Sequence, residues 1–117
     1  SIFKRSEENL FFEFPISLAD AALGTTIEVP TIDGGKAKVK IPSGTQQGKQ
    51  FRLKGKGMPL MRNKDYGDLY IRAVTEVPAS LTKEQKSLLE KFKKLEDSKS
   101  NPIMKDFFEK AKKFWRN

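Results

Sequence analysis

Cysteine and histidine are both absent from this chain of 117 residues. Without cysteine there is no disulfide framework and no thiolate metal site. Without histidine the chain lacks the commonest general base, the commonest metal ligand and any Ser-His or Cys-His nucleophile pair. We therefore expect a binding module rather than an enzyme. A chain free of cysteine also fits a reducing compartment, so we expect a cytoplasmic location.

Long hydrophobic runs are absent as well. No apolar run approaches the roughly 20 residues needed to span a bilayer, and we expect no membrane partner. The first residue is Ser1 rather than methionine, and no signal-peptide pattern follows it. We expect the chain to be a fragment or a processed piece, with other activities in parts that lie outside it.

Positive charge is divided unevenly along the chain. Residues 1–78 carry 12 Lys/Arg and 9 Asp/Glu, net +3, and residues 79–117 carry 11 and 6, net +5 of the total +8. Such an excess suits an acidic partner, but lysines at helical spacing also form an ordinary solvated face. A basic β-barrel that binds nucleic acid stays open as one alternative, and a scaffold that only dimerises as another. The leading interpretation includes no nucleic-acid partner.

Residues 1–78 read as a domain of short strands separated by turn signals. The Asp33-Gly34 pair predicts a hairpin. Sequential hairpins indicate a mainly β fold, a small antiparallel β-sandwich or partly open barrel. Alternating side chains predict strands over 10–15, 25–29, 36–41, 50–54 and 68–77.

One short helix interrupts these strands, within ISLADAALGTTIEVP. Ser17 can cap its first turn, with Asp20 three residues later in the capping-box position. Gly24 can close it in the left-handed conformation. A helix of about seven residues is marginal alone, so we expect it to pack three side chains on the sheet: Leu18, Ala22 and Leu23.

This inserted helix can leave a groove between itself and an exposed sheet edge. Such a groove suits an extended peptide, which adds backbone hydrogen bonds to the edge and places alternate side chains in apolar pockets. The same side chains can equally be ordinary core residues. The groove would be lined by Phe12, Phe14, Ile27 and Val29.

Two other patterns carry no site. The segment from Gly44 to Lys49 has three residues between its glycines and no Ser/Thr after the lysine, which a P-loop needs. Turn and solvent roles explain the acidic pair Asp65 and Asp68, so we expect neither catalysis nor a metal there.

Residues 79–117 read as a helical segment. Thr82 and Gln85 form a capping box before a helix over 83–96, and a polar linker precedes a second helix over 103–115. The second helix carries a large aromatic face, for which we expect dimerisation, with folding back or a membrane surface as alternatives. The predicted dimerisation residues are Leu88, Phe92, Ile103, Met104, Phe107, Phe108, Phe114 and Trp115.

Several motifs in this order resemble the C-terminal region of DnaJ-type co-chaperones over nearly the whole chain. The closing Phe-Phe…Lys-Lys-Phe-Trp tail is similar to a bacterial member. The motifs are Phe-x-Arg, Ala-Ala-Leu-Gly, the Asp-Gly turn, Ile-Pro-x-Gly-Thr, Gly-Lys-Gly-x-Pro and Gly-Asp-Leu.

The resemblance implies a second client-binding β subdomain (1–78) followed by dimerisation helices (79–117). It implies binding of unfolded, apolar polypeptide segments, homodimerisation, and delivery of clients to a DnaK-type chaperone through a J-domain elsewhere. The His-Pro-Asp loop and the Cys-x-x-Cys repeats of the family are absent here, so it implies no zinc or other cofactor in this fragment. Carried onto this sequence, the family's client groove comprises Phe12, Phe14, Ile27, Val29 and Ile71.

Overall fold

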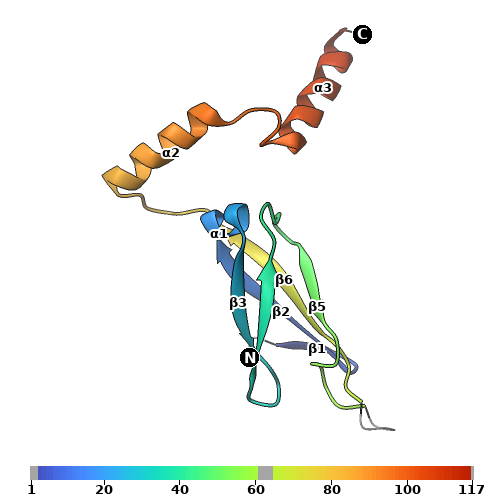
Figure 1. Ribbon diagram of the computed structural model, residues 1–117. Coiled ribbons are helices and arrows are strands. Elements are labelled where there is room, and N and C mark those ends of the chain that lie inside the picture. The colour runs from blue at the N-terminus through green and yellow to red at the C-terminus, as the bar shows by residue number, and fades with distance from the viewer. Residues whose placement is uncertain (1–2, 61–64, 117) are drawn as a thin grey trace. The chain divides into compact units, whose positions relative to one another are not determined.

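The structure, a computed structural model, describes residues 3–60 and 65–116 (Figure 1). It divides into two compact units, residues 1–78 and 79–117. The first unit consists of β1 (Lys4–Ser6), β2 (Asn9–Ser17), α1 (Leu18–Leu23), β3 (Thr25–Pro30), β4 (Lys36–Ile41), β5 (Gln50–Leu53) and β6 (Leu69–Glu76), and the second of α2 (Lys83–Leu95) and α3 (Pro102–Arg116).

Four strands form one sheet in the order β1-β2-β6-β5. β1 and β5 pair antiparallel with their neighbours, whereas β2 and β6 run parallel, from Leu10 opposite Leu69 to Ser17 opposite Glu76. The predicted mainly β class, with a short inserted helix and C-terminal helices, is confirmed. The sheet is mixed rather than a run of sequential hairpins, because the first long strand and the last strand of the unit lie side by side.

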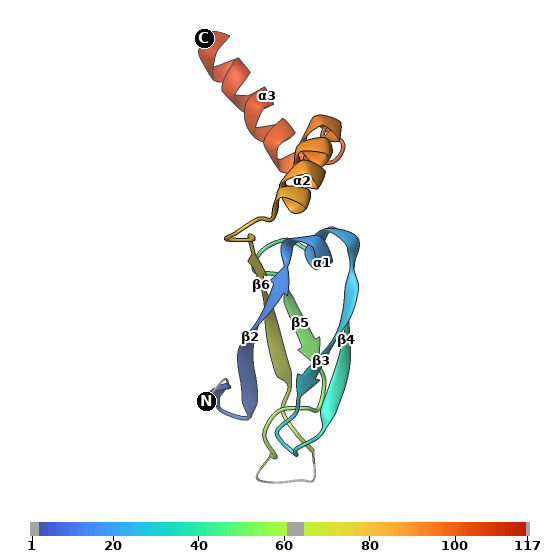
Figure 2. The ribbon, with the colours of Figure 1, turned by 90° about the vertical axis from the view of Figure 1, so that its left-hand side faces the viewer.

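The β3–β4 hairpin forms a second layer beside this sheet (Figure 2). Its turn was predicted from Asp33-Gly34, and the structure confirms it. Gly34 has φ +88°, a value that side chains rarely tolerate. The Thr31 N–H donates to the Gly35 carbonyl at 3.0 Å, and the Gly35 N–H donates to the Asp33 carboxylate at 3.0 Å.

Apolar side chains from both layers meet in one core. The four-stranded sheet contributes alternate residues of β2 and β6. The hairpin contributes alternate residues of β3 and β4, and α1 adds one alanine. The buried apolar residues are Leu10, Phe12, Ile16, Ala21, Val29, Val39, Ile41, Leu69, Ile71 and Ala73.

The turn between β1 and β2 is held by the loop that follows β5. The Met58 N–H donates to the Glu8 carbonyl at 2.7 Å. Gly67 packs against the same peptide, and a Cβ atom at Gly67 would lie 2.2 Å from the Glu8 carbonyl oxygen. No side chain fits in that space. The short β1, which sequence reasoning did not predict, is thereby fixed at one edge of the sheet.

Helix α1 begins and ends as predicted. The Ser17 hydroxyl accepts from the Asp20 N–H at 3.0 Å, and the chain leaves through Gly24 at φ +85° and ψ +153°. The helix therefore ends at the predicted glycine with a positive φ, but the ψ value is not left-handed helical, so the predicted conformation of Gly24 is wrong. A Cβ atom at Gly24 would lie 2.9 Å from the Ser43 nitrogen, so glycine is required for close approach as well as for φ.

The packing predicted for α1 is wrong. Ala21 is its one buried residue, whereas Leu18, Ala22 and Leu23 are exposed. The Ala21 carbonyl accepts from the Gly44 and Thr45 N–H groups at 2.9 and 3.0 Å. These bonds orient the helix through its backbone, and only the small side chain of Ala21 fits the close contact.

The helical unit contains no buried residue in either helix. At α2 the Thr82 hydroxyl accepts from the Gln85 N–H at 3.1 Å, and the Gln85 side chain accepts from the Thr82 N–H at 3.0 Å, which confirms the predicted capping box. Between the helices the Asp97 carboxylate accepts from the Lys99 and Ser100 N–H groups. These bonds lower the pKa of Asp97 below its ordinary value.

Candidate functional site: an open strand edge and an aromatic sheet face

The five predicted groove residues all belong to one cluster between the layers. Phe12, Val29 and Ile71 have exposed fractions of 5%, 0% and 1%. Phe14 and Ile27 are half-buried and pack against the same core. Three of the five are therefore core side chains in this structure, and only Phe14 and Ile27 offer surface to a ligand. Core side chains and groove-lining side chains alternate along a strand in the same way, so the sequence could not distinguish them.

One edge of β2 is open beyond Phe11. β1 pairs with β2 only from Asn9 to Phe11, and no other strand among residues 3–60 and 65–116 pairs with that side of β2. The Leu10 N–H donates to the Asp68 carbonyl at 2.9 Å, on the β6 side. Since backbone groups alternate along a strand, those of Glu13 and Pro15 point to the open side.

Pro15 is consistent with that open edge. A proline has no N–H to give to a sheet and is tolerated where its nitrogen faces an unpaired side. Pro15 lies opposite Val74 in the parallel pairing, and its missing donor removes nothing from the ladder with β6. The open edge thus offers the Glu13 N–H and the carbonyls of Glu13 and Pro15.

Two leucines of α1 are exposed. Leu18 follows directly after the end of β2 and is 39% exposed, and Leu23 is 79% exposed. Leu23 also borders a hollow of about 350 Å³ at the base of the β3–β4 hairpin, beside Gly24 and Lys40. Sequence reasoning placed both leucines in the core and so missed them as candidate contacts.

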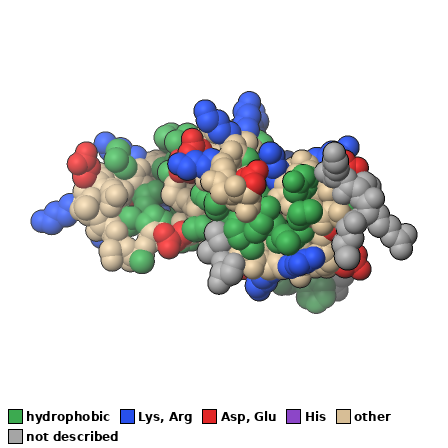
Figure 3. All heavy atoms as spheres, turned by 90° about the horizontal axis from the view of Figure 1, so that it is seen from below, with side chains coloured by type: hydrophobic (Ala, Val, Ile, Leu, Met, Phe, Trp, Pro, Cys, Tyr) green, Lys and Arg blue, Asp and Glu red, His purple; other side chains and the backbone are tan. Residues whose placement is uncertain are grey.

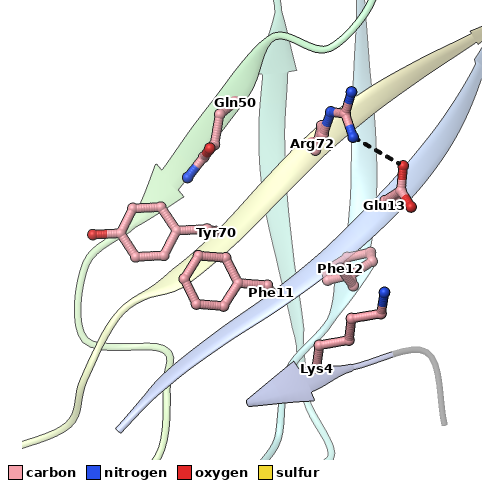
Figure 4. A pocket seen from close by; sticks show the side chains of 7 residues that line it. All are labelled: Lys4, Phe11, Phe12, Glu13, Gln50, Tyr70 and Arg72. Atoms are coloured by element: carbon pink, nitrogen blue, oxygen red, sulfur yellow. Dashed lines mark ion pairs between the residues drawn. The ribbon is translucent and has the colours of Figure 1, made fainter. Parts of the chain in front are cut away.

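The outer face of the four-stranded sheet carries a second feature. The rings of Phe11 and Tyr70 stack with centroids 4.9 Å apart and an interplanar angle of 11°. A cavity of about 390 Å³ opens beside them (Figure 4), and it is lined by Lys4, Phe11, Phe12, Glu13, Gln50, Tyr70 and Arg72. Phe11 and Tyr70 alternate with the buried residues of β2 and β6, and the parallel pairing that joins them was not predicted.

Charged groups surround this face as exposed pairs. The Arg72 guanidinium lies 3.6 Å from the Glu13 carboxylate, and the Arg52 Nε atom lies 3.9 Å from the Asp68 carboxylate. Within the described part of the chain, no cluster of acidic side chains could hold a metal ion. Among the described residues of this unit, only Asp33 has a lowered pKa, because the Thr31 hydroxyl and then the Gly35 N–H donate to its carboxylate. That turn is not part of either feature.

Hydrophobic side chains also reach the surface elsewhere. Figure 3 shows one face on which they lie among basic and acidic side chains. In the β unit the large exposed ones include Ile32, Tyr66 and Val77. Single apolar side chains of this kind are ordinary on protein surfaces, so they define no site by themselves.

All eight residues predicted for dimerisation are exposed in the helical unit. Phe107 and Phe108 touch edge to face, with centroids 5.3 Å apart. Exposure reaches 73% at Trp115 and 77% at Phe114. The others are Leu88, Phe92, Ile103 and Met104, all more than half exposed. The two units thus present different surfaces: an open strand edge with an aromatic sheet face, and an uncovered apolar helix face.

The chain thus joins a β unit with an open strand edge to two amphipathic helices that bury no residue. Comparison with known families identifies it further. The family described as DnaJ C terminal domain matches residues 1–78, and the family described as Chaperone protein DnaJ C-terminal region matches residues 84–117. The chain belongs to the DnaJ C-terminal domain family.

Curated relatives agree with this assignment. The chain is 74% identical over 116 residues to Chaperone protein DnaJ of Pelagibacter ubique, and 51% identical over 116 residues to that of Xanthobacter autotrophicus. It is 50% identical over 115 residues to that of Rhodopseudomonas palustris. These alignments cover 98–99% of this chain but only 30–31% of each relative. The predicted resemblance to a bacterial DnaJ-type C-terminal region is confirmed.

The relatives are named as chaperones, which agrees with the prediction of a binding module rather than an enzyme. Within residues 3–60 and 65–116, neither helix α2 nor α3 nor any other is long and apolar enough to cross a bilayer.

Proposed function

We propose that this chain is the client-binding and dimerising end of a DnaJ-type co-chaperone, and that it holds extended apolar polypeptide segments. The observation that carries the proposal is the open edge of β2 beside the half-buried Phe14. An extended peptide can add there as a further strand. Membership of the DnaJ C-terminal family and the chaperone names of the relatives support this role.

The incoming strand would continue along β2 from the point where β1 stops. Its backbone would form hydrogen bonds with the Glu13 N–H and with the carbonyls of Glu13 and Pro15. These bonds do not depend on the client's sequence. Its alternate side chains would contact Phe14 on the inner side and Leu18 near the strand end. Few backbone donors and two or three apolar contacts make a weak site, which suits a client that must be released again.

Homodimerisation through the helical unit is the second part of the proposal. Fully burying one large apolar side chain contributes roughly 1.5–3 kcal/mol, and the aromatic face of α3 leaves several such side chains in water. A second copy of the chain supplies a matching face. A dimer would present two open β2 edges to one client and raise its apparent affinity through effective concentration.

The remaining parts of the role lie outside this chain. Delivery of clients to a DnaK-type chaperone would use a J-domain in the rest of the protein, since the chain spans about 31% of its curated relatives. The absence of cysteine is compatible with a reducing cytoplasm. The proposal needs no cofactor in this fragment.

Fluorescence anisotropy with a labelled, extended, Leu- and Phe-rich peptide tests client binding. Phe14→Asp should weaken binding roughly tenfold or more, because it replaces an apolar contact by a charge. Ile32→Asp, in the turn between β3 and β4, makes a comparable change away from the edge and should leave binding unchanged. Unchanged affinity in Phe14→Asp would remove Phe14 from the site.

Strand addition has a sharper test at Glu13. Glu13→Pro removes the one N–H that the open edge offers at this position, while the bonds to β6 do not use it. Glu13→Gln removes the charge and keeps the donor. Only Glu13→Pro should weaken the binding of the peptide. A loss of affinity that instead follows added salt would indicate a charged ligand, as the nucleic-acid alternative requires.

A further inference from the structure

Four side chains form a row across the outer face of the four-stranded sheet. In the strand register Lys4 lies opposite Phe11, Phe11 opposite Tyr70, and Tyr70 opposite Arg52. Two cations thus flank a stacked aromatic pair. The next row along the sheet places Glu13 opposite Arg72 and Arg72 opposite Gln50. Paired aromatics in such a row stabilise a sheet, but this row also borders a cavity.

The cavity beside the aromatic pair has the size of a side-chain site. Its volume of about 390 Å³ is bounded by the Phe11 and Tyr70 rings and by the edge of the Phe12 ring (Figure 4). Gln50 adds an amide that can donate to and accept from a peptide group. An apolar floor with a few polar groups at the rim is the usual composition of a binding pocket.

The charge at the rim selects among possible ligands. Arg72 is paired with Glu13 at 3.6 Å. Lys4 forms no ion pair with any described carboxylate, although its side chain runs toward Glu13 in Figure 4. The cavity therefore has one cation without a carboxylate partner next to an apolar floor. A carboxylate attached close to a bulky apolar group complements that arrangement.

We propose that this outer face is a second polypeptide-binding surface, which takes a segment carrying an aromatic side chain beside an acidic residue. The surface goes beyond the open β2 edge, because Phe11, Glu13, Tyr70 and Arg72 alternate with the inward-facing residues of β2 and β6, and Phe12 is the one lining residue on the same face as Phe14. Single-stranded nucleic acid fits less well. The Phe11 and Tyr70 rings cover each other's faces, so no base can stack between them.

The test compares short labelled peptides with Glu-Phe-Glu, Lys-Phe-Lys or Glu-Ser-Glu at the centre of a Gly-Ser segment, titrated with the whole chain. We expect Glu-Phe-Glu to bind best. Tyr70→Ala should weaken it about three- to tenfold, as expected for losing an aromatic contact. Lys4→Glu should weaken it about two- to fivefold, the size of an exposed ion pair, and should reduce its advantage over Lys-Phe-Lys.

Matched variants separate this surface from general effects. Lys38→Glu on β4 makes the same charge change elsewhere and should leave binding unchanged. Tyr70→Phe keeps the ring, and it should bind normally even if Tyr70→Ala folds poorly. Phe14→Asp should weaken the Leu- and Phe-rich peptide but not Glu-Phe-Glu, so the two proposals fail separately.

Three outcomes would overturn the inference. One is equal affinity for Glu-Phe-Glu and Lys-Phe-Lys. Another is tight, salt-sensitive binding of oligo-dT that Tyr70→Ala abolishes, because a nucleic acid would then be the occupant. The third is a change of oligomeric state in Tyr70→Ala at normal peptide affinity, because a second copy of the chain would then cover this face.

Discussion

The β unit and the helical unit differ in how far their apolar side chains are buried. The β unit buries ten apolar residues in one cluster between two layers. The helical unit buries none, although α3 alone carries four aromatic residues. The β unit thus resembles a complete folded domain. The helices have their capping box and polar turns in place, but they lack a surface to cover their apolar face, and we expect a second copy of the chain to supply it.

The largest effect is expected from a change that prevents a second copy of the chain from covering this apolar face. Replacing Phe107 and Phe108 together by serine should turn dimers into monomers, because each protomer loses roughly 3–6 kcal/mol of apolar burial. Analytical ultracentrifugation measures the mass. The β unit should keep its unfolding midpoint, because its core contains neither of these phenylalanines. If the mass stays that of a dimer, the contact lies elsewhere, with Leu88 and Phe92 of α2 to be replaced next.

A smaller effect is expected from the core of the β unit. Leu69→Ala should cost about 2–5 kcal/mol of unfolding free energy, because the side chain is fully buried and leaves a cavity. Urea unfolding followed by circular dichroism at strand wavelengths measures the loss. Trp115, the single tryptophan, lies in the helical unit, so its fluorescence should not follow the shifted transition. Val77→Ala, at an exposed site, serves as the control.

The smallest expected effect concerns pH at the β3–β4 turn. The Thr31 hydroxyl and the Gly35 N–H lower the pKa of Asp33 below its ordinary value of 3.8. Its contribution to stability is therefore complete above that value and is lost as pH falls through the lower pKa of the folded state. Thermal midpoints measured down through this range should fall less steeply in Asp33→Asn than in the parent chain. Parallel slopes would exclude a role for this carboxylate.

Much of the local structure could be predicted from the sequence, and the pairing could not. Capping residues and alternation gave both long helices, α1 and the five longer strands. Lys4–Ser6 has no hydrophobic alternation, so β1 was missed. The parallel contact of β2 with β6 depends on two segments far apart in the chain, which local patterns do not specify.

The candidate site was predicted only in outline for a related reason. Phe12 and Phe14 share one face of β2, yet Phe12 is buried and Phe14 keeps exposed surface. Which of them contacts a ligand depends on where β1 stops, and the sequence gives no sign of that point. Phe11 and Tyr70 become one feature only through the β2–β6 register, which the sequence does not specify.

The parallel pairing of β2 with β6 also bears on how this protein is made. Leu10 of β2 can pair with Leu69 only after that residue has been synthesised, 59 residues later. Until then β2 is an unpaired apolar strand on a nascent chain, and contacts between such distant segments form slowly. During its own synthesis the chain therefore presents the same kind of segment that we propose it holds in its clients, and early on it is a candidate substrate for chaperones already in the cell.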